Sequence, residues 1–136
     1  MGLKSFWKTY KRYRRQKKSG LTFPVLTKIH GVKTQDRQGA LAQSASGDKL
    51  QLVHVALPDY PYNVYVYSVT LNRILGYLDV TLAKNLFLVF GDGFCLDGTL
   101  DDILGGPPLK YRGARIRIYD DNVFMQNEIF STLYEQ

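Results

Sequence analysis

Alternation of apolar and polar positions predicts that most of the chain after residue 20 forms β-strands. The segments rich in β-branched and aromatic residues lie at 21–32, 50–57, 62–69, 94–104 and 112–120. "PDYP" separates the second segment from the third and has the composition of a tight turn. Period-two alternation places Asn63 on the same side of its strand as Tyr65 and Tyr67, and it turns Arg115 and Arg117 outward.

Helical spacing of apolar residues predicts two helices. Leu3, Phe6, Trp7, Tyr10 and Tyr13 recur at this spacing within 2–17, with basic residues on the other sides and Ser19-Gly20 as the stop. "VTLAKNLFLVF" (80–90) is the second helix, which "GDG" ends.

The remaining segments are less regular. We expect 34–49 to be a long polar connection with a weak strand near Gly39–Gln43, and 122–136 to form a closing helix. About six strands with one embedded helix and a basic N-terminal helix predict a mainly β (α+β) fold, a small β-barrel.

The length and composition fit a single globular domain. The chain has 136 residues, of which 45% are apolar and 22% charged. The chain has one cysteine, so an intrachain disulfide is excluded. No apolar run approaches the roughly 18 residues that span a bilayer, and the N-terminus lacks the pattern of a secretory signal. We therefore expect a cytoplasmic protein, with an arm at 1–20 and a barrel domain with a C-terminal helical tail at 21–136.

The positive charge is concentrated in that arm. The chain has 18 basic and 12 acidic residues, a formal net charge of +6. Eight of the basic residues and none of the acids lie in 1–20, so residues 21–136 keep 10 basic residues against all 12 acids, a formal charge of −2. An arm of this kind favours binding to a polyanion, and its candidate phosphate-binding residues are Lys11, Arg12, Arg14 and Arg15.

Signatures of catalysis are sparse. The chain has no P-loop, no dinucleotide glycine fingerprint and no paired-cysteine metal site. His30 and His54 each stand alone in strand segments, and Cys95 is interpreted as a buried, inert thiol. The acids at 92, 97, 101 and 102 lack the spacing of a calcium loop. We expect no enzyme activity, no catalytic residue, no metal and no cofactor.

Three motifs resemble the HIRAN family over roughly residues 24–119. They are "LQLVHVALPDYPYNVYVYSV", "ILGYLDVTLAKNL" and "LGGPPLKYRGARIRI", and "LTKIHGV" resembles the opening strand. The resemblance implies a modified OB-like β-barrel. It also implies a module that binds single-stranded DNA, in the best understood case at a free 3′ end.

The resemblance also suggests site residues. The turn that carries an aromatic residue and an acid in the DNA-end-binding relative is matched by Tyr62 and Asn63. Tyr77 stands in place of a histidine of the family, and Lys33 keeps the positive charge that follows the first strand. Thr34 and Gln35 stand where the resemblance leads us to expect an aromatic pair, and Asp79 and Val80 stand where it leads us to expect basic residues. A carboxylate at a phosphate position is repulsive.

Two functions follow as hypotheses. The first is a non-catalytic nucleic-acid-binding module for single-stranded DNA or DNA ends, which works with a DNA-processing protein. In this module the arm binds nucleic acid together with residues of the barrel, namely Lys33, Tyr62, Asn63, Tyr77, Arg115 and Arg117. The alternative is a protein- or membrane-interaction domain that has lost the DNA pocket and lays the arm on a partner or on anionic lipid. Tyr62 and Tyr77 also fit ordinary surface aromatics, and Arg115 and Arg117 fit a solvated strand face.

Overall fold

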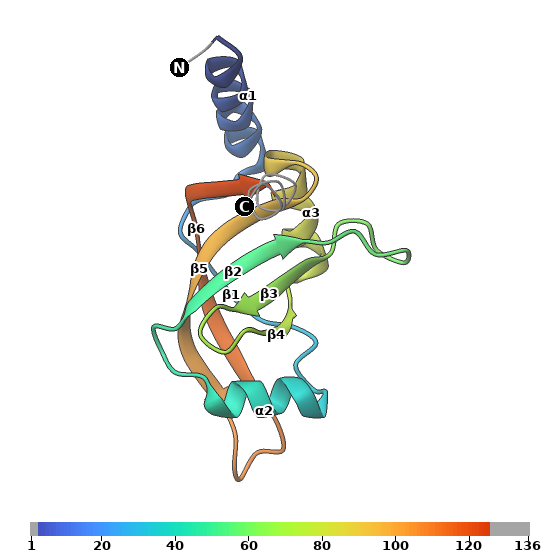
Figure 1. Ribbon diagram of the computed structural model, residues 1–136, viewed down its shortest axis with the longest axis vertical. Coiled ribbons are helices and arrows are strands. Elements are labelled where there is room, and N and C mark those ends of the chain that lie inside the picture. Colours follow the sequence, from blue (N-terminus) through green and yellow to red (C-terminus); the bar gives the residue numbers. More distant parts are fainter. Residues whose placement is uncertain (1–2, 126–136) are drawn as a thin grey trace, which may run out of the picture.

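The computed structural model describes residues 3–125, which fold mainly into one antiparallel sheet (Figure 1). The strands within this range are β1 (Val25–Lys28), β2 (Lys49–His54), β3 (Val64–Ser68), β4 (Arg73–Tyr77), β5 (Phe94–Gly105) and β6 (Arg112–Met125). The helices in the same range are α1 (Leu3–Ser19), α2 (Gln35–Gln43) and α3 (Val80–Phe90). The prediction of a mainly β fold with a basic N-terminal helix is confirmed.

The sheet wraps around a core but is not a closed barrel. Its strand order is β1-β6-β5-β2-β3-β4, so β1 and β4 are the two edges. A single antiparallel bridge links these edges: His30 donates its N–H to Tyr77 O at 2.8 Å, and Tyr77 donates its N–H to His30 O at 2.9 Å. The barrel prediction therefore holds only loosely.

The strong curvature of β5 and β6 allows the sheet to wrap. Their pairing shifts register between Leu96 and Gly98 and again between Leu100 and Asp102, and such bulges bend a strand and increase its twist. A Cβ atom at Gly98 would lie 2.7 Å from Leu52 Cδ2 and 2.8 Å from Arg117 O. Glycine at this bulge therefore lets three strands approach each other closely.

The core follows the predicted alternation. The inward residues of the strands are fully or almost fully buried: Leu50, Leu52, Val64, Val66, Leu75, Leu96, Leu100, Ala114, Ile116 and Ile118. Ala83, Leu86, Val89 and Phe90 of α3 complete the core beside them. Burying each large apolar side chain contributes roughly 1.5–3 kcal/mol relative to exposure, so this core is the main source of stability.

One predicted element was wrong in type. The weak strand near Gly39–Gln43 is instead the helix α2, so residues 21–125 contain two helices where one embedded helix was predicted. Thr34 caps this helix by accepting the Arg37 N–H at 3.3 Å. Only Ala40 and Leu41 of its nine residues are buried, so its sequence carries little helix-period apolar pattern.

The predicted closing helix was also wrong at its start. Residues 122–125 belong to β6, where Val123 pairs with Leu96. The rest of that predicted helix, 126–136, lies outside the described residues.

Candidate nucleic-acid interface

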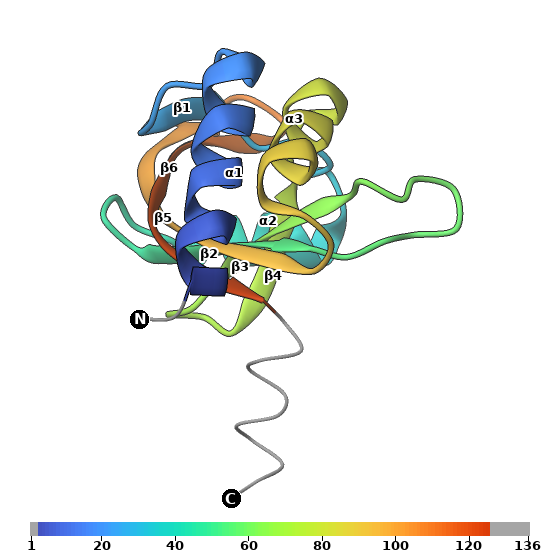
Figure 2. The ribbon, with the colours of Figure 1, turned by 90° about the horizontal axis from the view of Figure 1, so that it is seen from above.

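The basic helix α1 lies beside α3 at one end of the molecule (Figure 2). Arg12 is half-buried, with its Cζ 5.7 Å from the centre of the Phe90 ring, which is a cation–π distance. This predicted phosphate-binding residue therefore holds α1 against α3. Among the side chains of α1 that the structure describes, the exposed cations are Lys11, Arg14, Arg15, Lys17 and Lys18.

A groove of about 350 Å³ runs between the two helices. Arg15, Lys18 and Ser19 of α1 form one wall, and Asn85 and Leu88 of α3 form the other. Ser19 also ends α1, because its Oγ donates to Gln16 O at 2.6 Å and accepts the Leu21 N–H at 3.3 Å. The wall that α1 supplies is positively charged.

Tyr62 lies across the exposed face of α3. Its ring is 5.0 Å from the Phe87 ring at an interplanar angle of 61°, and Lys84 Nζ is 5.7 Å from its centre. Lys84 and Leu88 are four residues apart on α3 and therefore share a face. Lys84 therefore lies between Leu88 in the groove and the Tyr62 ring.

Asn63 departs from the predicted position. It is 5% exposed and does not share the half-exposed side of Tyr65 and Tyr67. Its Nδ2 meets no hydrogen-bond acceptor among the described residues. An unpaired buried N–H donor is costly, roughly 1–3 kcal/mol, and because this atom is buried a ligand does not reach it in this structure.

His54 fixes the turn that carries Tyr62. Its Nδ1 accepts the Gly93 N–H at 2.8 Å, and its Nε2 lies 2.7 Å from Pro61 O. Because Nδ1 accepts, the proton of the neutral ring lies on Nε2 and is donated to Pro61 O. Asp92 Oδ1 is 3.3 Å from Nδ1 and forms an ion pair only if the ring is protonated. This buried histidine is thus structural, tying the turn to the α3–β5 junction.

Lys33 lies just before α2, the helix at the end of the molecule opposite α1 (Figure 1), and Tyr77 is the last residue of β4, a strand that contacts α2. The Tyr77 ring covers Gly31, where a Cβ atom would lie 2.0 Å from Tyr77 Cε1. Arg37 Cζ is 5.9 Å from the same ring, and Lys33 Nζ is 5.3 Å from the Tyr111 ring.

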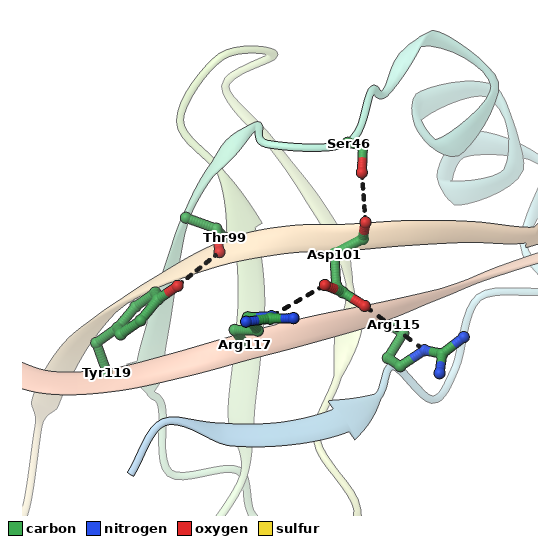
Figure 3. Close-up of polar contacts among 6 residues, drawn as sticks. All are labelled: Ser46, Thr99, Asp101, Arg115, Arg117 and Tyr119. Atoms are coloured by element: carbon green, nitrogen blue, oxygen red, sulfur yellow. Dashed lines mark hydrogen bonds and ion pairs between the residues drawn. The ribbon is translucent and has the colours of Figure 1, made fainter.

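Arg115 and Arg117 point outward from β6, as predicted, but both pair with Asp101 (Figure 3). Arg117 Nε donates to Asp101 Oδ1 at 2.9 Å, and Arg115 Nε lies 3.8 Å from Oδ2. Ser46 Oγ also donates to the Asp101 carbonyl. The carboxylate offsets part of the positive charge of this predicted phosphate track.

The structure therefore brings the predicted residues together in three groups. The arm and Tyr62 share the α1–α3 end, Lys33 and Tyr77 share the α2 end, and Arg115 and Arg117 lie on the outer face of the sheet. Sequence reasoning missed Lys84, Arg37 and Tyr111. Lys84 is the basic residue of the predicted helix 80–90 and follows the buried Ala83, so the helical period could have placed it on the exposed face.

The remaining candidate groups carry little chemistry. Cys95 is buried, which raises the pKa of its thiol to about 11. Burial, followed by Asp79 and Tyr62, raises the pKa of the Tyr60 hydroxyl, which donates to Val80 O at 2.6 Å. Within residues 3–125 no three histidine, cysteine or acidic side chains gather as they would around a metal ion.

The helices over the same range are too short or too polar to cross a membrane. No family model, curated protein or solved structure matches the chain. Membership of the HIRAN family stays a prediction.

Proposed function

We propose that this chain is a non-catalytic nucleic-acid-binding module that takes single-stranded DNA. The observation that carries the proposal is the α1–α3 surface, formed by Lys11, Arg14, Arg15, Lys18, Lys84 and Tyr62. Here Arg15 and Lys18 of α1 line a groove against α3, and Lys84 of α3 lies 5.7 Å from the centre of the Tyr62 ring.

The chemistry of this surface suits a single strand. Lysine and arginine side chains neutralise phosphates and release counterions, which supplies affinity without regard to sequence. Base stacking on an aromatic ring contributes roughly 1–3 kcal/mol per base and needs an unpaired base. A duplex offers phosphates to α1 but keeps its bases from Tyr62.

The burial of Asn63 argues against recognition of a free 3′ end. Its Nδ2 is unpaired but buried, and its 5% exposure favours binding along a strand over capture of a strand end. We expect an oligonucleotide with a free 3′ hydroxyl and one with a 3′ phosphate to bind with similar affinity.

The test replaces three exposed cations of the arm with glutamine, as R14Q/R15Q/K18Q. Glutamine keeps helix propensity close to that of arginine and lysine, so α1 is retained. Three lost phosphate contacts on a single strand weaken binding roughly 100-fold near 0.1 M salt. Fluorescence anisotropy with a labelled oligothymidylate measures the dissociation constant.

The matched control is K28Q/K49Q/R73Q, which removes three exposed cations of the strands outside the α1–α3 surface. Equal weakening in both variants would mean that net charge alone drives binding. Absence of binding to the full chain contradicts the proposal.

A second candidate function is attachment to an anionic membrane surface. Leu88 of α3, which lines the groove with Arg15 and Lys18, and Tyr13 of α1 are exposed, and apolar groups beside cations suit a lipid interface. Cosedimentation with vesicles containing phosphatidylserine, without DNA affinity, would favour this candidate.

A further inference from the structure

A second group of cations lies at the opposite end of the molecule, around α2 and the β5–β6 turn. We name this group the α2 pole; it consists of Lys33, Arg37, Lys110 and Arg112 with the rings of Tyr77 and Tyr111. The two rings are 38% and 37% exposed. The α2 pole therefore presents positive charge and aromatic surface together.

The cations are gathered on the rings. Lys33 Nζ and Lys110 Nζ each lie 5.3 Å from the centre of the Tyr111 ring, and Arg37 Cζ lies 5.9 Å from that of Tyr77. Two ammonium groups on one ring repel each other, and an anion bound between them relieves that repulsion. A nucleotide could supply this anion, because its phosphate can bind the two ammonium groups while its base stacks on the Tyr111 ring.

Hydrogen bonds fix the backbone that carries these groups. Gln38 Nε2 donates to Val32 O at 2.7 Å and to Arg112 O at 2.8 Å, and Gln38 Oε1 accepts the Arg112 N–H at 2.9 Å. Gly105 has a φ of +74°, and a Cβ atom there would lie 2.5 Å from Tyr111 O. The turn is therefore tight, and contacts within the chain itself hold the backbone of the α2 pole in place.

The charge of the α2 pole is not neutralised within the chain. None of its four cations forms an ion pair with a residue of the described part of the chain, whereas Arg115 and Arg117 share Asp101. Asp36, in the first turn of α2, is the acid of this segment and is likewise outside the ion pairs of the described residues. The four cations and this acid carry a formal charge of +3.

We infer that the α2 pole is a second contact site for single-stranded nucleic acid, so that one strand binds both ends of the molecule. The inference rests on the function proposed above and adds to it that a long strand contacts both sites on the protein. A strand that reaches both sites binds the second one intramolecularly, which raises affinity by about 10²–10⁴ over either site alone. A short strand occupies the α1–α3 surface only.

The experiment compares oligothymidylates of about 10 and about 40 nucleotides on three full-length proteins. These are the unmodified chain, K33Q/K110Q, and the control K28Q/K49Q, which removes two exposed lysines of β1 and β2. We expect K33Q/K110Q to weaken binding of the long strand by at least about 10-fold and of the short strand by less than about 3-fold. Circular dichroism melting confirms that all three proteins fold.

Each other outcome is decisive. Equal loss for the long strand in K33Q/K110Q and K28Q/K49Q overturns the inference and leaves the α1–α3 surface as the binding site. Equal loss for the short and long strands in K33Q/K110Q shows that the α2 pole adds no second contact. If no oligonucleotide binds the unmodified chain, the proposed function fails first and this inference with it.

Discussion

At the scale of single residues, Gly31 sets the position of Tyr77. Its φ is +66°, which side chains rarely adopt, and the tyrosine ring occupies the space of the missing Cβ. Gly31→Ala must therefore displace the ring and strain the backbone, and we expect a loss of roughly 1–3 kcal/mol in the free energy of unfolding. Urea denaturation measures it.

Gly39 is the control for this substitution. It lies inside α2, and a Cβ atom there would meet no heavy atom within 4 Å. Gly39→Ala should stabilise the protein by roughly 0.5–1 kcal/mol, because alanine reduces the entropy lost when the helix forms. Destabilisation by both substitutions to the same extent would contradict the close packing of Tyr77 on Gly31.

Cys95 illustrates a residue whose state was predictable. Burial raises its thiol pKa to about 11 from the ordinary 9.0, so the thiolate population at neutral pH is roughly 100-fold lower than in the unfolded chain. We expect negligible alkylation by iodoacetamide in the native protein and full alkylation in denaturant, measured by mass spectrometry. Rapid native alkylation would show that the thiol is accessible.

At the scale of elements, Asp79 caps the N-terminus of α3, in addition to placing a negative charge near the candidate site. It caps α3, because Oδ2 accepts the N–H groups of Thr81 at 3.1 Å and Leu82 at 3.2 Å. Asparagine caps as well as aspartate does, so Asp79→Asn should change stability little, while Asp79→Ala should cost roughly 1 kcal/mol.

The same pair of variants separates capping from repulsion. Asp79→Asn removes a negative charge beside the turn of Tyr60, so we expect tighter binding of oligothymidylate without loss of stability. Unchanged binding in Asp79→Asn would show that bound phosphates do not approach the start of α3.

The sequence predicted elements where the apolar period is strong. Leu86 and Phe90 lie on one buried face of α3, and Ile116 alternates with Arg115 and Arg117 in β6. The helix α2 was missed because polar side chains and Gly39 dominate it, and its place is fixed by the Gln38 hydrogen bonds to residues 32 and 112. Such long-range contacts leave no local pattern.

At the scale of the whole molecule, the residue types of the candidate site were predicted but their grouping was not. Lys33, Tyr62 and Tyr77 were predicted to bind nucleic acid as residues of one barrel. In the fold, Tyr62 contacts Lys84 of α3, Tyr77 contacts Arg37 of α2, and Lys33 contacts Tyr111 after the β5–β6 turn. Figure 1 shows α2 and α3 at different ends of the strands. Side-chain identity is local information, whereas grouping depends on strand order.

The candidate phosphate-binding charges are also divided between different parts of the molecule. The α1–α3 surface and the α2 pole carry unpaired cations at the two ends, and Asp101 offsets part of the charge of Arg115 and Arg117 on the sheet between them. A long polyanion is therefore attracted to both ends more strongly than to the middle.

The salt dependence of binding tests the central claim most directly. Fluorescence anisotropy of the full chain with a labelled oligothymidylate is measured across a range of salt concentrations. The five exposed cations among the described side chains of α1 predict a slope of about −3 or steeper for the logarithm of the association constant against the logarithm of salt concentration. They also predict that R14Q/R15Q/K18Q makes this slope shallower by about 2. A slope near zero, or one that this variant leaves unchanged, would contradict a role for α1 in binding nucleic acid.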